Sequence, residues 1–268
     1  GLVAAPDQAR SQAEIAVAEA RPVAVLAISS YDEMKADVTL IGGLMGKPQL
    51  ATGLEALISL ATQSRGLQGL DKARPMGAVA LTDGERFGGY VCLPASDFDQ
   101  LLQTAKVLGA QVEETGRGVY RVKTRNKPVY AKAQSGWAVV SEDRDVLDVV
   151  PGNPGAALVE AGCEYDVAVR LLVDNVPAKH RREAIDKIRH DAARDLARRP
   201  GESDEEYALR KRVTEELVDT VVSLVEEVDE VTLGWSLDHE RKRASLEASL
   251  TASEGTEIAR AASRLGEV

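Results

Sequence analysis

Aromatic side chains are scarce in this sequence: Phe, Trp and Tyr together account for 4% of its 268 residues. Sites for sugars and for single-stranded nucleic acids stack their ligands on aromatic rings, so the scarcity argues against both. The formal net charge of −10 argues against nucleic acid independently, because two polyanions repel each other. We therefore expect no nucleic-acid partner.

Cysteines and long apolar runs are also lacking. The two cysteines, Cys92 and Cys163, lie far apart, and neither has a second cluster of metal ligands beside it. This pattern favours two buried thiols over a disulfide framework or a zinc site. No stretch approaches the ~20 apolar residues that a membrane-spanning helix needs. We expect no transmembrane segment.

Motifs for cofactor binding and catalysis are missing as well. Gly42–Lys47 resembles a phosphate-binding loop, but its glycine spacing is too short, and Pro48 stands where a Ser or Thr would hold magnesium. We interpret it as the end of a helix. No Gly-x-Ser-x-Gly nucleophile motif occurs. The sequence predicts no cofactor and no catalytic residue.

The three histidines do not form a metal site by spacing. His180 and His190 are separated by about 80° of rotation on a predicted helix, so they do not form a ligand pair. His239 lies between Asp238 and Glu240, but consecutive side chains of a tight turn point in different directions. We interpret this segment as a solvated turn and predict no metal ion.

One arrangement of elements occurs twice. Pro22–Ser30 is similar to Asp166–Asp174, and Gly77–Gly109 has the layout of Leu233–Gly266. In each copy an apolar strand leads into helices, and a β-hairpin that turns at Asp83 or Asp238 follows. The repeat predicts an α+β fold of two tandem related units, each an antiparallel sheet covered by helices.

The second unit is predicted to be incomplete. Only the first unit continues into short strands over 111–142, which we expect to form an antiparallel meander. Pro151–Gly155 combines two prolines with two glycines and marks a boundary. The predicted organisation is an arm or helix over 1–21, repeat unit 1 over 22–150, a linker over 151–162 and a truncated repeat unit 2 over 163–268.

Apolar periodicity predicts where the core lies. The continuous run Val23–Ile28 is typical of a strand buried on both faces. Alternation predicts that one face of the hairpin over 231–250 belongs to the core, through Val231, Leu233, Trp235, Leu237, Ala244, Leu246, Ala248 and Leu250. A capping box at Ser203–Glu206 starts a helix that we expect to end near Val228 and to turn inward Leu209, Val213, Leu217, Val221 and Leu224.

A basic stretch is the strongest local signal for an interaction. Arg117–Lys132 contains six basic residues, two interleaved tyrosines and no acidic residue. It is interpreted either as a solvated or charge-guarded sheet surface, or as a docking site for an acidic partner, including this protein's own acidic helix. The candidate binding residues are Arg117, Tyr120, Arg121, Lys123, Arg125, Lys127, Tyr130 and Lys132.

The helix pair over 177–228 divides its charge, with a basic first helix and a second helix that is acidic toward its C-terminus. Two interpretations stay open. One is complementary pairing across an antiparallel helical hairpin. The other is a protruding arm for self-association.

Two segments carry a family resemblance. Gly69–Asp71 with Arg74–Gly77, and Pro200–Arg210 with Leu233–Trp235, resemble secreted proteins of planctomycete-type bacteria. The order of strands and helices is also similar to a wider family of exported bacterial proteins of unknown function. The resemblance implies export and a longer parent chain, and brings no active site. The small residues of Gly1–Pro6, typical of a secretory cleavage region, favour the same extracytoplasmic location.

These observations predict a non-catalytic extracytoplasmic binding or scaffold protein. One alternative is a carrier of apolar ligands or lipids, held in a cavity between sheet and helices. The other is a hydrolase whose polar residues converge only in three dimensions.

Overall fold

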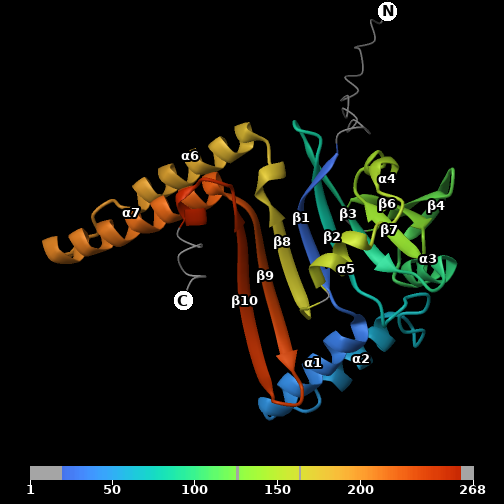
Figure 1. Ribbon diagram of the computed structural model, residues 1–268. Coiled ribbons are helices and arrows are strands. Elements are labelled where there is room, and N and C mark those ends of the chain that lie inside the picture. The colour runs from blue at the N-terminus through green and yellow to red at the C-terminus, as the bar shows by residue number, and fades with distance from the viewer. Residues whose placement is uncertain (1–19, 125–126, 163, 261–268) are drawn as a thin grey trace, which may run out of the picture.

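The computed structural model describes residues 20–124, 127–162 and 164–260. In this part of the chain all strands join one antiparallel sheet in the order β10-β9-β8-β1-β2-β3-β7-β6-β5-β4 (Figure 1). The α+β prediction is confirmed, but the two sheets expected are one continuous sheet. The strands are β1 (Arg21–Ile28), β2 (Met76–Thr82), β3 (Phe87–Pro94), β4 (Gln111–Gly116), β5 (Val119–Lys123), β6 (Pro128–Gln134), β7 (Trp137–Ser141), β8 (Val167–Leu172), β9 (Val228–Asp238) and β10 (Arg243–Ala252).

Two helices begin at serine caps, and one of these is the capping box at Ser203–Glu206 that the sequence predicts. Ser30 accepts a hydrogen bond from the backbone N–H of Glu33 at 3.0 Å, and Ser203 and Glu206 form a complete capping box. The helices are α1 (Tyr31–Leu44), α2 (Leu50–Ala61), α3 (Phe98–Val107), α4 (Val146–Val149), α5 (Ala156–Gly162), α6 (Ala178–Asp195) and α7 (Asp204–Glu227), with a short 3-10 turn over Val173–Asn175. Most of the arm expected over 1–21 and the end of the second copy of the repeat, at Gly266, lie outside the described residues.

The centre of the sheet is the antiparallel pair of β1 and β8, in which Leu26 lies opposite Val169. Each of these strands continues into two helices and then a β-hairpin, so the strand order read outward from the centre is the same on both sides. This topology agrees with tandem units. Their relatedness and their boundaries stay predictions.

The two hairpins that flank this centre, β2–β3 and β9–β10, contain the same side-chain contact at their turns. Asp83 accepts hydrogen bonds from the backbone N–H groups of Glu85 and Arg86, and Asp238 accepts them from those of Glu240 and Arg241, all at 2.8 to 2.9 Å. These donors hold the pKa of both carboxyls below its ordinary value. An aspartate therefore ends both strands in the same way.

The main core lies on the face of the sheet that carries α4 and α5. Leu147 and Leu158 are fully buried there against Val25, Val79 and Val139 of the strands. The segment expected as a linker, 151–162, thus contains a helix packed on the sheet, in contact with β1, β2 and β8. A smaller core lies on the opposite face, where α3 packs on β5, β6 and β7.

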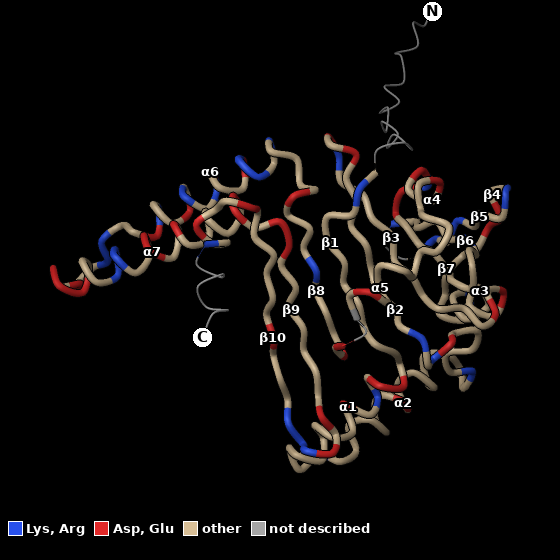
Figure 2. The backbone as a smooth tube through the Cα atoms, in the orientation of Figure 1, with Lys and Arg blue, Asp and Glu red and all other residues tan. Residues whose placement is uncertain are grey.

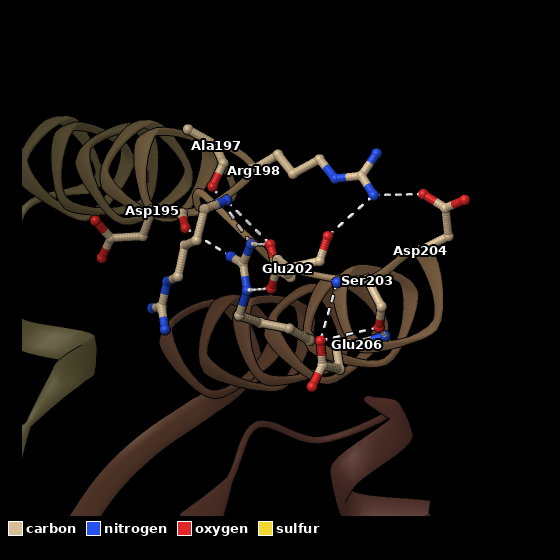
Figure 3. A network of polar contacts seen from close by, with 9 residues as sticks. Asp195, Ala197, Arg198, Glu202, Ser203, Asp204 and Glu206 are labelled. Carbon is tan, nitrogen blue, oxygen red and sulfur yellow. Dashed lines mark hydrogen bonds and ion pairs between the residues drawn. The ribbon is translucent and has the colours of Figure 1, made fainter.

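The helices α6 and α7 form a hairpin that projects beyond the strands (Figure 1). Its tip is a network of polar contacts, shown in Figure 3. The guanidinium of Arg210 binds both carboxylate oxygens of Glu202, at 2.7 and 2.6 Å, and donates to the backbone oxygens of Asp195 and Ala197. Arg210 belongs to α7, whereas Asp195 is the last residue of α6 and Ala197 lies just after it, so this side chain fixes the two helices to each other.

Candidate functional site

A row of side chains crosses the whole sheet on the face opposite to α4 and α5, which we name the open face. Directly paired residues of antiparallel strands share a face, so the strand register defines the row. Of its ten residues only the last, at the β4 edge, is charged. In order from β10 to β4 the row is Ala248, Leu233, Val169, Leu26, Ala78, Val91, Val140, Ala131, Tyr120 and Glu114.

Two parallel rows extend the open face between β10 and β2. One contains Leu246, Trp235, Val167, Ile28 and Met76, and the other contains Leu250, Val231, Leu171, Ala24 and Ala80. Figure 2 shows few charged residues in the middle of these strands, among them Arg170 of β8 and Glu247 of β10. Arg170 lies on the other face, where it pairs with Glu160 of α5 and Glu230 of β9.

The open face is solvent-exposed over these strands. Leu26, Val91, Leu171, Leu233, Leu246 and Leu250 are between 40% and 78% exposed. Two sequence predictions are therefore wrong: β1 is buried on one face only, and the apolar side of the β9–β10 hairpin is largely exposed. Alternation indicates which residues share a face, but it does not indicate whether another layer covers them.

The open face continues into an apolar groove of about 380 Å³ beneath α3. Val140 and Ala131 of the ten-residue row line the groove, and Val91, next to Val140 across the strands, is exposed outside it. Leu108, which follows α3, is exposed at the solvent side. The groove is therefore the end of the open face that α3 covers.

The groove offers no charge to a ligand. Its lining side chains are apolar except for Tyr31 and Thr104, and the Thr104 hydroxyl already contacts the backbone oxygens of Gln68 and Gln100. A polar group that enters the groove loses its hydrogen bonds to water and finds no partner there, which is unfavourable. The groove therefore suits the hydrocarbon part of a ligand.

The basic stretch predicted as a docking site divides between the two faces of the sheet. Tyr120 lies on the open-face side and packs edge-on against Phe98, with ring centroids 5.7 Å apart. Tyr130 packs against the main core, and Lys132 donates a hydrogen bond to the carbonyl oxygen of Leu147 in α4. These three side chains are occupied by contacts within the fold.

The other basic residues are more accessible. Arg117 is exposed in the turn between β4 and β5, Lys123 is half-buried, and Lys127 pairs with Glu142 at 3.6 Å. Arg125 lies outside the described residues. The stretch is thus a set of separate positions, and its docking role stays a prediction.

Arg121 faces a surface hollow of about 830 Å³ between β5, β6 and the segment after β7. Its Nε is buried and has no hydrogen-bond partner among the described residues. The hollow is also lined by three acidic residues, Glu142, Asp143 and Asp145, and by three further basic residues, Arg86, Lys127 and Arg144. Its charges are therefore mixed and favour neither an acidic nor a basic partner. Sequence reasoning missed these acids because they follow in a later strand connection.

His239 lies in an exposed turn, as the sequence predicts, and its side chain is 43% exposed but also contacts α1. Its Nε2 lies 2.7 Å from Oδ1 of Asp37, a buried residue of α1. Burial raises the pKa of the Asp37 carboxyl above its ordinary value, an effect that the hydrogen bond from His239 only partly offsets. The contact joins the tip of the β9–β10 hairpin to the first helix.

His180 and His190 are both on α6, and His180 contacts Glu183 and the backbone oxygen of Glu85. In the described residues no three His, Cys, Asp or Glu side chains are grouped as they would be around a metal ion. Cys92 is a buried free thiol, as predicted, and Cys163 lies outside the described residues. No described helix has the length and apolarity to cross a bilayer.

Comparison with models of protein families, with curated proteins and with solved structures finds no match to the chain. The resemblance to exported bacterial proteins therefore stays a prediction, as does the extracytoplasmic location that it implies.

Proposed function

We propose that this chain is a non-catalytic binding protein that carries an apolar ligand on the open face of its sheet. The observation that carries the proposal is the uncovered apolar face of six strands that leads into the groove beneath α3. The groove volume of about 380 Å³ falls within the range of known small-molecule sites. Of the functions that the sequence left open, this arrangement favours the carrier.

The preferred ligand is a long hydrocarbon chain. Its end fits the groove, where no charged side chain is present, and its remainder lies along the exposed rows. Each methylene moved from water into such a site contributes about 0.8 kcal/mol. An aliphatic chain fits an almost entirely aliphatic surface, whereas a sugar or a nucleotide base has few rings here to stack on.

Tryptophan fluorescence tests the proposal. Of the two tryptophans, Trp235 lies on the open face and Trp137 is buried in the main core. Bromine atoms quench indole fluorescence at short range, so a dibrominated stearate should quench the chain saturably while stearate itself does not. Trp235→Phe should remove the quenched component and leave the Trp137 emission.

Variants then locate the ligand. Leu171→Gln and Leu233→Gln place an amide on the open face, and each should weaken stearate binding by about tenfold. The matched control is Ser249→Gln, which adds the same amide to the opposite face of β10 and should leave binding unchanged. Quenching that fails to saturate, together with native mass spectra free of bound lipid, would contradict the proposal.

A further inference from the structure

The projecting arm of α6 and α7 carries an apolar stripe that nothing in the described part of the chain covers. Leu209, Val213, Leu217 and Val221 recur at every fourth position of α7 and are 63%, 46%, 60% and 39% exposed. Residues at this spacing share one side of a helix. The prediction that these four side chains point inward is therefore wrong, and they form a stripe about 18 Å long.

The stripe is separate from the side of α7 that packs within the chain. Val222, the buried residue of α7, lies about 160° around the helix axis from the centre of the stripe at 100° per residue. Arg210 and Glu202 hold the arm together at its tip (Figure 3). The arm thus presents the stripe outward on a braced pair of helices.

We propose that a second copy of this chain covers the stripe, with the two α7 helices antiparallel and the two arms packed as a four-helix bundle. Two helical hairpins related by a two-fold axis are a common route to such bundles. The self-association is independent of the open face, because α7 contributes no residue to the rows or to the groove.

The order of side chains in the stripe matches an antiparallel partner. Leucine and valine alternate along it, so a two-fold axis near residue 215 places Leu209 opposite Val221 of the second copy and Val213 opposite Leu217. Every level then contains one large and one small side chain, which keeps the helices evenly spaced. A parallel partner would place leucine against leucine and valine against valine, layers that parallel two-stranded coiled coils also use, so the charges beside the stripe decide the orientation.

Charge beside the stripe selects the same orientation. Arg212 and Glu216 are exposed on one flank of the stripe, and neither has an ion-pair partner among the described residues. In the antiparallel arrangement Arg212 lies near Glu216 of the second copy, and the reciprocal contact forms by symmetry. In a parallel arrangement the flanks that carry Arg212 and Glu216 would lie on opposite sides of the interface, so this pair would not form.

The stripe is short, so the expected dimer is reversible. Interfaces that bury less than about 1,200 Å² in total are typical of weak or transient complexes. We expect a dissociation constant on the order of 1 to 100 µM, which a dilution series can follow.

Sedimentation velocity of the full chain over a range of concentrations tests the proposal. The wild type should change from monomer to dimer, and Leu217→Glu should stay monomeric with an unchanged circular dichroism spectrum, since residue 217 is exposed. Arg212→Glu and Glu216→Arg should each weaken the dimer by about tenfold, and the double variant should restore it.

The matched control reverses a charge pair elsewhere on α7. Lys211 and Glu215 lie 3.8 Å apart, away from the stripe, so Lys211→Glu with Glu215→Lys should leave the dimer intact. A wild type that is monomeric at about 100 µM would overturn the proposal. So would a dimer that survives Leu217→Glu, or single charge variants that the double variant does not rescue. Quenching by dibrominated stearate should persist in Leu217→Glu, which separates this test from that of the proposed function.

Discussion

The imidazole of His239 lies 2.7 Å from the carboxylate of Asp37, and this contact joins residues 202 positions apart. It fixes the far end of the β9–β10 hairpin to α1, whereas β10 itself lies at an edge of the sheet. We predict that His239→Ala lowers the free energy of unfolding by about 1–3 kcal/mol, because a buried carboxyl loses its partner. Urea unfolding measures this loss. His190→Ala, an exposed change on α6, is the control and should stay within about 0.5 kcal/mol of the wild type.

The same pair predicts a dependence of stability on pH. Because the pKa of Asp37 is raised in the folded protein, its contribution is fully present below the ordinary value of 3.8 and is lost as the pH rises through the raised value. Asp37→Asn keeps an oxygen that can accept the hydrogen bond and removes the titration. Thermal unfolding at a series of pH values from about 3.5 to about 7 measures this effect. As the pH rises, the melting temperature of the wild type should fall relative to that of Asp37→Asn. Parallel curves for the two proteins would contradict the prediction.

The arm tip should respond to pH in the opposite direction. Arg210 and the backbone N–H of Arg199 lower the pKa of Glu202 from 4.5 to about 2. The contribution of this carboxylate is present above pH 4.5 and is lost as the pH falls through about 2. Glu202→Gln should speed amide exchange in the α6–α7 connection at pH 6 but not at about pH 2, once exchange is corrected for its intrinsic pH dependence. The control is Glu205→Gln, an exposed change three positions along the chain, which should leave the amide exchange rate unchanged at both pH values.

Gly155 is required by close packing. A Cβ atom at this position would lie 1.9 Å from the ring of Trp137, which is buried in the main core. Gly155→Ala should lower the free energy of unfolding by about 1–3 kcal/mol, the usual cost of overfilling a core. Gly152→Ala is the matched control, because its Cβ would meet no atom within 4 Å and the backbone there is not left-handed. Equal melting temperatures for the two variants would contradict this account.

Cys92 should resist alkylation in the native protein. Burial raises the pKa of its thiol to about 12, and the thiolate is the form that reacts. Peptide mapping after iodoacetamide at about pH 8.5 should find Cys92 unmodified in the folded chain and modified in urea. Labelling of Cys92 at the same rate in both states would show that the core over β3 opens readily.

Local elements were predictable from the sequence because short-range chemistry determines them. Ser30 and Ser203 cap helices, and Asp83 with Gly84 turns a hairpin, through contacts made within three residues. The joining of the strands into one sheet was not predictable, because β1 and β8 meet across about 140 positions and no local pattern encodes such a pairing.

The candidate site was missed for a related reason. The sequence drew attention to the charged stretch over 117–132, whereas the open face consists of residues that each look like ordinary core. Leu246 and Leu250 differ from buried leucines only in what lies above them, which depends on the whole topology. An uncovered layer becomes visible only once the strand order is known.

The central pairing of β1 with β8 also has a consequence for synthesis. A chain that emerges from the ribosome N-terminus first exposes β1 to β7 before β8 exists, so seven strands can assemble while β1 is still an edge. Until β8 is made, the backbone N–H and C=O groups on one side of β1 stay unpaired and Leu26 stays exposed on its surface. A partly synthesised chain is therefore most prone to aggregate through β1, the strand that lies in the middle of the finished sheet.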